Sequence, residues 1–154
     1  MAVKALESLS RFRDSDIILR VDVFIARDAA ADLEILNRLR PSPPLWGFLI
    51  GHMRGPRCFV ERIFPAGAGA VLPSPVELDA IDRGLGRKVV GLFAVRPSAA
   101  FRRSVAGSYF YGRLVLDVRP AKKGPALRAF AVEFDGKFLL VPTALRREPK
   151  KAKP

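Results

Sequence analysis

Residues 89–107, with the sequence VVGLFAVRPSAAFRRSVAG, constrain the fold more than any other stretch of the chain. They open with the apolar run VVGLF, whose length and β-branched content are typical of a buried strand. Arg96 and Pro97 end this strand, because proline has no backbone N–H to donate to a sheet. A short helix that carries Ser104 is predicted to follow. A buried strand that stops and turns towards a helix is a common place for a site in α/β folds.

The rest of the chain predicts a mixture of strands and helices. Apolar periodicity predicts strands over residues 17–26, 45–53, 57–64, 113–118, 127–134 and 137–143, and helices over residues 3–9, 29–39 and 74–85. Asp28 is expected to cap the helix that follows it, and Ser74 with Glu77 forms a capping-box pattern. The small-residue loop 65–73 lacks the Gly-Lys-Ser/Thr of a phosphate loop, so it does not predict nucleotide binding.

Composition predicts one basic domain. The 154 residues are 49% apolar, which suits a single core, and we expect that domain to span residues 1–145. The formal net charge is +12, and residues 146–154 are expected to form a basic, disordered tail. One cysteine, Cys58, excludes an internal disulfide, and no apolar run is long enough to span a membrane. These features, with an N-terminus unlike a signal peptide, predict a cytoplasmic protein.

The stretch 89–107 resembles the JAMM/MPN (JAB-like) family of zinc isopeptidases. Val89, Gly91 and Phe93 match the strand of that family, and Pro97 and Ser104 keep the spacing that follows it. Upstream, residues 44–51 (PLWGFLIG) keep both glycines and the leucine of the family's Glu-x-x-Gly-x-Leu-x-Gly. Downstream, residues 114–118 and 129–130 are similar to two further strands of the family.

The matched stretches fall within residues 21–141, most of the chain. The resemblance implies an α/β protein made of a single MPN-like (cytidine-deaminase-like) domain, in which a curved mixed β-sheet is flanked by helices.

The residues that carry the chemistry of this family are replaced. Ala94 and Arg96 stand where the family has its two histidine ligands, and Gly107 stands where it has its aspartate ligand. Pro44 replaces the catalytic glutamate. Alanine and glycine offer no donor atom and a guanidinium is positively charged, so these positions do not hold zinc. The resemblance therefore implies a degenerate member with no metal and no cofactor, a pseudoenzyme.

These features predict a non-catalytic protein-binding or scaffold module. Its partner would be a paralogue of the same family, a ubiquitin-like protein or a second copy of the chain. The alternative is association with nucleic acid or another polyanion through the basic surface and tail. A third reading, an active hydrolase that borrows its ligands from elsewhere, is less favoured, because His52 is the only histidine and cannot build a zinc site alone.

Basic and aromatic residues near the vacated positions are the candidates for binding a partner or an anion. They are Arg96, Arg102, Arg103, Tyr109 and Tyr111. The Arg96 guanidinium either fills the former metal pocket or faces solvent, and the tyrosines either bind or form the lid of a core. Asp79 and Asp82 are spaced like paired catalytic carboxylates, but a solvated helix surface is the simpler reading.

Overall fold

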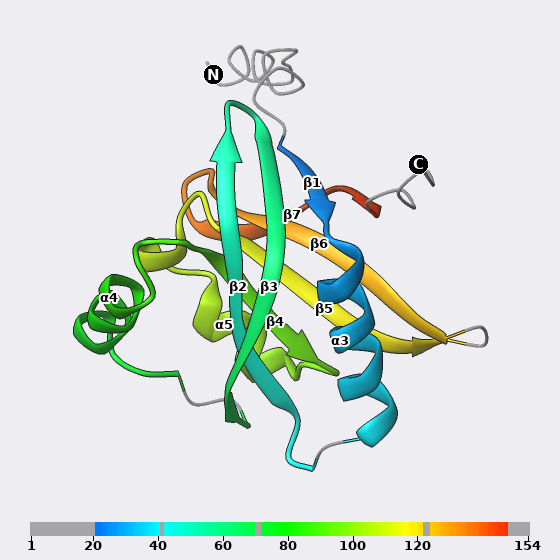
Figure 1. Ribbon diagram of the computed structural model, residues 1–154. Coiled ribbons are helices and arrows are strands. Elements are labelled where there is room, and N and C mark those ends of the chain that lie inside the picture. The colour runs from blue at the N-terminus through cyan, green and yellow to red at the C-terminus, as the bar shows by residue number, and fades with distance from the viewer. Residues whose placement is uncertain (1–20, 41, 70–71, 122–123, 148–154) are drawn as a thin grey trace.

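The computed structural model describes residues 21–40, 42–69, 72–121 and 124–147, which form a closed barrel of seven strands (Figure 1). The strands are β1 (Asp22–Ile25), β2 (Leu45–Arg54), β3 (Arg57–Ala68), β4 (Val89–Val95), β5 (Leu114–Ala121), β6 (Gly124–Phe134) and β7 (Phe138–Arg147). The helices are α3 (Arg27–Leu39), α4 (Pro75–Gly84), α5 (Ala99–Val105) and the 3-10 helix η1 (Ser108–Phe110).

The short strand β1 closes the barrel. The strand order is β1-β3-β2-β4-β5-β6-β7, and β1 pairs in parallel with both β3 and β7. The β4–β5 pair is also parallel, whereas β2–β3, β2–β4, β5–β6 and β6–β7 are antiparallel. Because β1 pairs with β7, residues 22–25 lie beside residues 144–147 near the other end of the chain.

Strand alternation divides the apolar residues into two cores. On β2, Leu49 points to an inner core together with Val23 and Val60, and three residues of α3 close this core: Ala29, Ala30 and Leu33. The flanking Phe48 and Ile50 point outwards instead, into a second core that α4, α5 and η1 cover. Trp46 is 4% exposed and belongs to this outer core.

The helices begin and end where local chemistry dictates. Ser74 and Glu77 form the predicted capping box at the start of α4. Asp28 is not the cap of α3, contrary to the prediction, because the helix already begins at Arg27 and Asp28 lies in its first turn, where its charge suits the helix dipole. Asp82 does not lie on a solvated face as predicted: it is 6% exposed.

Two glycines of β2 lie where neighbouring backbones approach closely. The pairing of β2 with β3 shifts register beside Gly47 and beside Gly51. A Cβ on Gly51 would lie 1.8 Å from the carbonyl oxygen of Phe59, and one on Gly47 would lie 2.3 Å from that of Phe64. Only glycine fits these two bulges.

The predicted α/β architecture, a curved sheet flanked by helices on an MPN-like plan, is wrong. The described residues form a closed mixed barrel made mostly of strand, with three short α-helices. The strand pattern was predicted well, but its closure depends on β1 pairing with β7 across almost the whole sequence, which no local pattern reveals. The predicted loop 65–73 also begins late, because β3 continues to Ala68.

Other predictions fall partly or wholly outside the described residues. The helix over residues 3–9 and the first part of the strand over 17–26 lie there. Of the predicted basic tail, Arg146 and Arg147 belong to β7, and residues 148–154 are not described. Within the described part of the chain, no helix combines the length and apolar character needed to cross a bilayer.

Candidate binding face

The tip of the β2–β3 hairpin and the neighbouring start of β1 have no described helix over them (Figure 1). Strand pairing places His52 of β2 opposite Phe59 of β3, Phe59 opposite Phe24 of β1, and Phe24 opposite Arg146 of β7. We call these four residues the ring row. The three rings are half-buried and belong to neither core, and Arg146 is exposed.

The three rings of the ring row stack against one another. The ring centroids of Phe24 and Phe59 are 5.2 Å apart with an interplanar angle of 16°, and those of His52 and Phe59 are 5.1 Å apart with an angle of 17°. Neighbouring rings therefore cover each other's faces and present their edges outwards. A shallow pocket of about 260 Å³ runs along the row, lined by Phe24, Ile25, Ala26, His52, Phe59, Val60 and Glu61.

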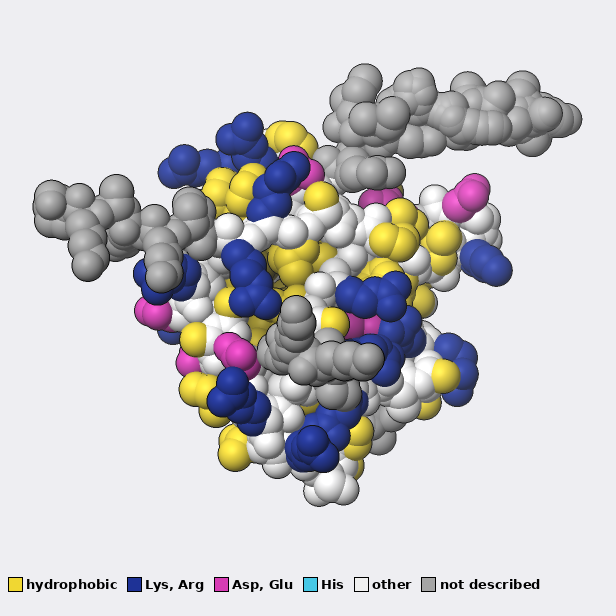
Figure 2. Space-filling view, turned by 90° about the vertical axis from the view of Figure 1, so that its right-hand side faces the viewer, with side chains coloured by type: hydrophobic (Ala, Val, Ile, Leu, Met, Phe, Trp, Pro, Cys, Tyr) yellow, Lys and Arg dark blue, Asp and Glu magenta, His cyan; other side chains and the backbone are white. Residues whose placement is uncertain are grey.

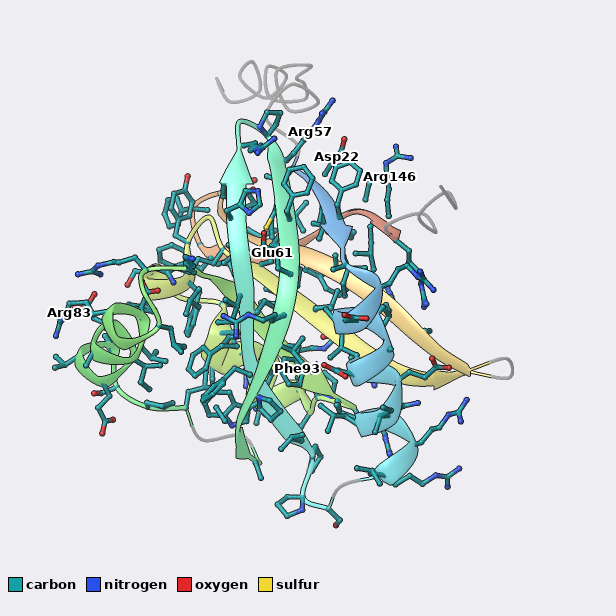
Figure 3. All side chains as sticks on the ribbon, viewed as in Figure 1. Asp22, Arg57, Glu61, Arg83, Phe93 and Arg146 are labelled. Atoms are coloured by element: carbon teal, nitrogen blue, oxygen red, sulfur yellow. The ribbon has the colours of Figure 1, made fainter. Side chains whose placement is uncertain are left out.

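Basic side chains surround one end of the ring row. Arg54 and Arg57 pair across the β2–β3 hairpin, two residues from His52 and Phe59, and both are exposed. Figure 3 shows Arg57 and Arg146 on either side of Asp22 at this end of the barrel. Glu61 already has a partner on the protein, because its Oε2 lies 3.1 Å from Nδ1 of His52. The view in Figure 2 shows that Lys and Arg side chains outnumber acidic ones on an adjoining side of the molecule.

Two of the predicted site positions do come together. Pro44 and Ala94 line one pocket of about 70 Å³, with Trp46, Pro97 and Phe101 among its other walls. Most of the residues that line this pocket are apolar. The end of β4 and the start of β2 are adjacent because these strands pair antiparallel, with Ala94 opposite Trp46.

Arg96 does not fill that pocket. Its backbone adopts a left-handed conformation (φ 52°) just after β4, which turns the side chain away from the side of Ala94. One Nη2 N–H donates to the carbonyl oxygen of Asn37 on α3, at 3.2 Å. Since α3 packs on the inner core and α5 on the outer one, the guanidinium lies away from Ser104.

Ser104 and Gly107 take no part in the pocket either. The Ser104 hydroxyl donates to the carbonyl oxygen of Ala100, one turn earlier in α5, at 3.0 Å. Gly107 precedes η1, and a Cβ built on it would meet nothing within 4 Å. Neither residue therefore has an evident chemical role.

Arg102 has a structural partner that the sequence analysis did not assign. It forms an ion pair with Asp117 of β5, a residue with no exposed surface, and its guanidinium also lies 5.5 Å from the ring centroid of Phe130. Arg119 approaches the same carboxylate at 3.8 Å. Burial raises the pKa of Asp117, while the positive charges of Arg102, Arg119 and Arg128 oppose that rise. In the sequence, the one feature that indicated this ion pair was the single aspartate, Asp117, within the apolar run LVLDV.

Of the other predicted binding residues, Arg103 and Tyr111 are exposed and Tyr109 is packed against its neighbours. Arg103 is exposed on α5, and Tyr111 is 57% exposed at an edge-on contact with Phe138. Tyr109 packs edge-on against Phe110 and lies under the guanidinium of Arg113. The tyrosines therefore lie over the outer core, and they are separate from the ring row.

The thiol of Cys58 is expected to be unreactive in the folded protein. The side chain is fully buried, and burial raises the pKa of its thiol to about 12, so almost no thiolate forms at neutral pH. An aromatic disulfide reagent should leave the native protein unmodified and should label one thiol per chain after unfolding in guanidinium. Rapid labelling of the native protein would show that β3 opens far more often than the packing implies.

The described residues also hold no group of three or more His, Cys, Asp or Glu side chains placed to bind a metal ion. No protein-family model matches the chain, and no curated protein matches it in sequence. Its fold is similar to the solution structure of protein DSY2949 from Desulfitobacterium hafniense, with a TM-score of 0.59 and 16% sequence identity over 83% of this chain and 95% of that one. At this identity the similarity concerns the fold alone.

Proposed function

We propose that this protein is a non-catalytic binding module that docks an acidic protein segment on the ring row. The observation that carries the proposal is the row itself: three stacked rings cross three strands, and Arg146, Arg54 and Arg57 stand beside them. An uncovered row of rings with basic neighbours suits an extended partner segment that alternates acidic and apolar side chains. The proposal does not depend on the JAMM/MPN resemblance.

The ring geometry favours a protein segment over single-stranded nucleic acid. Nucleobases bind proteins by stacking on open aromatic faces. Here Phe59 has a ring on either side, so its faces are already covered. The outward-facing ring edges carry partial positive charge. They therefore interact better with carboxylates and apolar side chains than with the faces of nucleobases, which are negative.

The state of the reactive side chains supports a binding role. The thiol of Cys58 is buried and protonated, and the hydroxyl of Ser104 is engaged by its own helix. His52 pairs with Glu61, and no described serine or reactive cysteine stands beside it. A nucleophile needs an adjacent base to be activated, and these groups are apart.

A labelled peptide of alternating glutamate and leucine tests the proposal. The intact protein should bind this peptide and should not bind its lysine–leucine counterpart. Phe59→Ala should weaken binding about tenfold, the effect of losing a central anchor. Phe134→Ala is the matched control, because Phe134 is also exposed (55%) but lies outside the row. Equal weakening by both substitutions, or no binding of the acidic peptide, would contradict the proposal.

Nucleic-acid association is the second candidate, because the chain carries a formal net charge of +12. It requires binding to a short oligothymidylate that falls steeply with salt. Truncation after Arg147 should abolish that binding if the basic C-terminal residues carry it, while leaving β7 complete. Retention of full oligonucleotide affinity by the truncated chain would assign binding to the barrel instead.

A further inference from the structure

A second, larger pocket lies beyond His52, on the side away from Phe59. It measures about 480 Å³, which is within the range of small-molecule sites. Its walls are Gly51, His52, Met53, Glu61, Arg87, Lys88, Val89, Val90, Gly112 and Arg113. Three cations thus face the pocket against one carboxylate, and that carboxylate, Glu61, is paired with His52.

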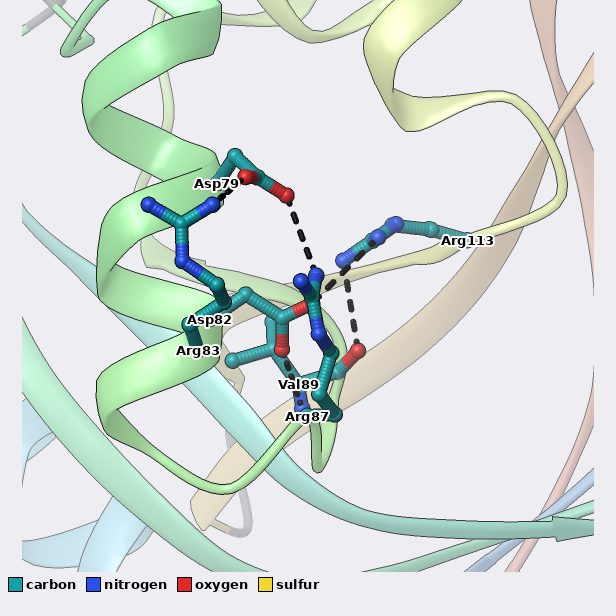
Figure 4. Close-up of polar contacts among 6 residues, drawn as sticks. All are labelled: Asp79, Asp82, Arg83, Arg87, Val89 and Arg113. Carbon is teal, nitrogen blue, oxygen red and sulfur yellow. Dashed lines mark hydrogen bonds and ion pairs between the residues drawn. The ribbon is translucent and has the colours of Figure 1, made fainter.

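Arg87 is held in place by an unusual turn. It follows Gly86 after α4, and both residues have left-handed backbones, with φ of 76° for Gly86 and 61° for Arg87. The Arg87 backbone N–H donates to the carbonyl oxygen of Asp82 at 2.8 Å. Its guanidinium contacts Asp79 at 3.1 Å and Asp82 at 3.9 Å (Figure 4). A left-handed arginine is uncommon, and such residues are enriched at functional sites.

Arg113 reaches the same place from the other side of the pocket, from the turn after η1. Its guanidinium donates to the carbonyl oxygen of Val89 at 3.3 Å and approaches Asp82 at 3.8 Å. The same group lies 5.1 Å from the ring centroid of Tyr109. These three contacts fix the guanidinium and leave its other N–H groups for the pocket.

Asp82 is the positioning residue of this arrangement. Its side chain is 8% exposed, one oxygen accepts the backbone N–H of Val89 at 3.2 Å, and the other faces both arginines (Figure 4). One buried carboxylate therefore holds two guanidinium groups at one mouth before any ligand arrives. Preorganised donors lose little conformational entropy on binding.

Lys88 adds a third positive charge to those of Arg87 and Arg113. It is exposed, it lines the pocket, and it forms no ion pair with any described residue. Arginine forks match the oxygens of phosphate, and lysine contributes a point charge. Met53, which is 48% exposed, and residues 89 and 90 of β4 also line the pocket, which has room for more than a bare phosphate.

We propose that this pocket binds a small organic phosphomonoester. Arg87, Arg113 and Lys88 receive the phosphate, and the organic body lies against Met53, Val89 and Val90. The pocket shares His52 and Glu61 with the pocket along the ring row, but Arg87, Lys88 and Arg113 lie outside that row, so this proposal does not rest on the proposed function.

Equilibrium titrations of the full chain with glucose 6-phosphate, AMP, inorganic phosphate and glucose test the site. At least one of the two phosphomonoesters should bind saturably and more tightly than inorganic phosphate, and glucose should not bind. Lys88→Gln should weaken the binding at least about fivefold, and Arg113→Lys at least about tenfold, because it keeps the charge and loses the fork.

Lys137→Gln is the matched control, because Lys137 is an exposed lysine on the β6–β7 turn, outside the pocket. Its affinity should equal that of the unmodified protein, and unchanged circular dichroism should show that each variant is folded. Absence of saturable phosphomonoester binding, inorganic phosphate binding more tightly than both esters, or equal weakening by Lys137→Gln would each overturn the proposal. A Phe24→Ala variant, at a ring-row residue that does not line this pocket, should bind the ester normally, so the two proposals fail independently.

Discussion

Replacing Arg102 by leucine should lower the free energy of unfolding by about 3 kcal/mol at neutral pH, the lower end of the range for breaking a buried ion pair. Asp117 has no exposed surface, and Arg102 is its nearest charge partner. Arg119 remains at 3.8 Å and limits the loss. Urea unfolding followed by circular dichroism measures the change. Arg103→Leu, on the exposed neighbour, should stay within about 0.5 kcal/mol.

The pH dependence of this loss has a defined sign. Burial holds the pKa of Asp117 above its ordinary value in the folded chain. Ionisation of this carboxyl therefore lowers the free energy of unfolding: the loss is absent at low pH, where the carboxyl is protonated in both states, and complete above the raised pKa. Loss of Arg102 removes the strongest opposing charge and raises that pKa further. The destabilisation should therefore be largest at neutral pH and should shrink as the pH falls towards about 4.

A double variant separates the charge from the packing. Arg102→Leu combined with Asp117→Leu removes both charges and should recover most of the lost stability, because apolar residues often replace buried ion pairs without loss. A loss that is independent of pH, or a double variant as unstable as the single one, would show that Arg102 acts by packing on Phe130 instead.

Gly51→Ala should cost more than about 3 kcal/mol, above the usual range for an overpacked core. The new methyl group would lie 1.8 Å from the carbonyl oxygen of Phe59, which is backbone and cannot rotate away. The β2–β3 pairing beneath the ring row would have to shift. Urea unfolding measures the loss.

Gly84→Ala supplies the comparison for that substitution. Gly84 ends α4, and a Cβ there meets nothing within 4 Å. Alanine should be neutral or should stabilise the protein by up to about 1 kcal/mol, its advantage over glycine in a helix. Similar losses at Gly51 and Gly84 would contradict the close approach at the bulge.

The sequence contained enough to predict most elements but not their closure. Alternation marked the strand around Val23 and Ile25, and the capping box marked the start of α4. What joins the barrel is the pairing of Phe24 with Arg146, residues far apart in the chain. Strand register between distant segments leaves no local pattern.

The candidate sites were less predictable than the elements, for the same reason. Pro44 and Ala94 lie together because β2 and β4 pair, whereas Ser104 and Gly107, which the resemblance grouped with them, lie elsewhere. The left-handed backbone of Arg96, and the hydrogen bond that its side chain donates to Asn37 on α3, could not be predicted from its position before Pro97. The ring row consists of ordinary outward-facing residues on three strands and becomes visible only when those strands are in register.

Amide chemical-shift mapping on adding the glutamate–leucine peptide tests the central claim most directly. The account predicts shifts concentrated at His52, Phe59, Phe24 and Arg146, with the residues around Ala94 unchanged. Shifts centred on the small pocket of Pro44 and Ala94, or spread evenly over the basic surface, would contradict it.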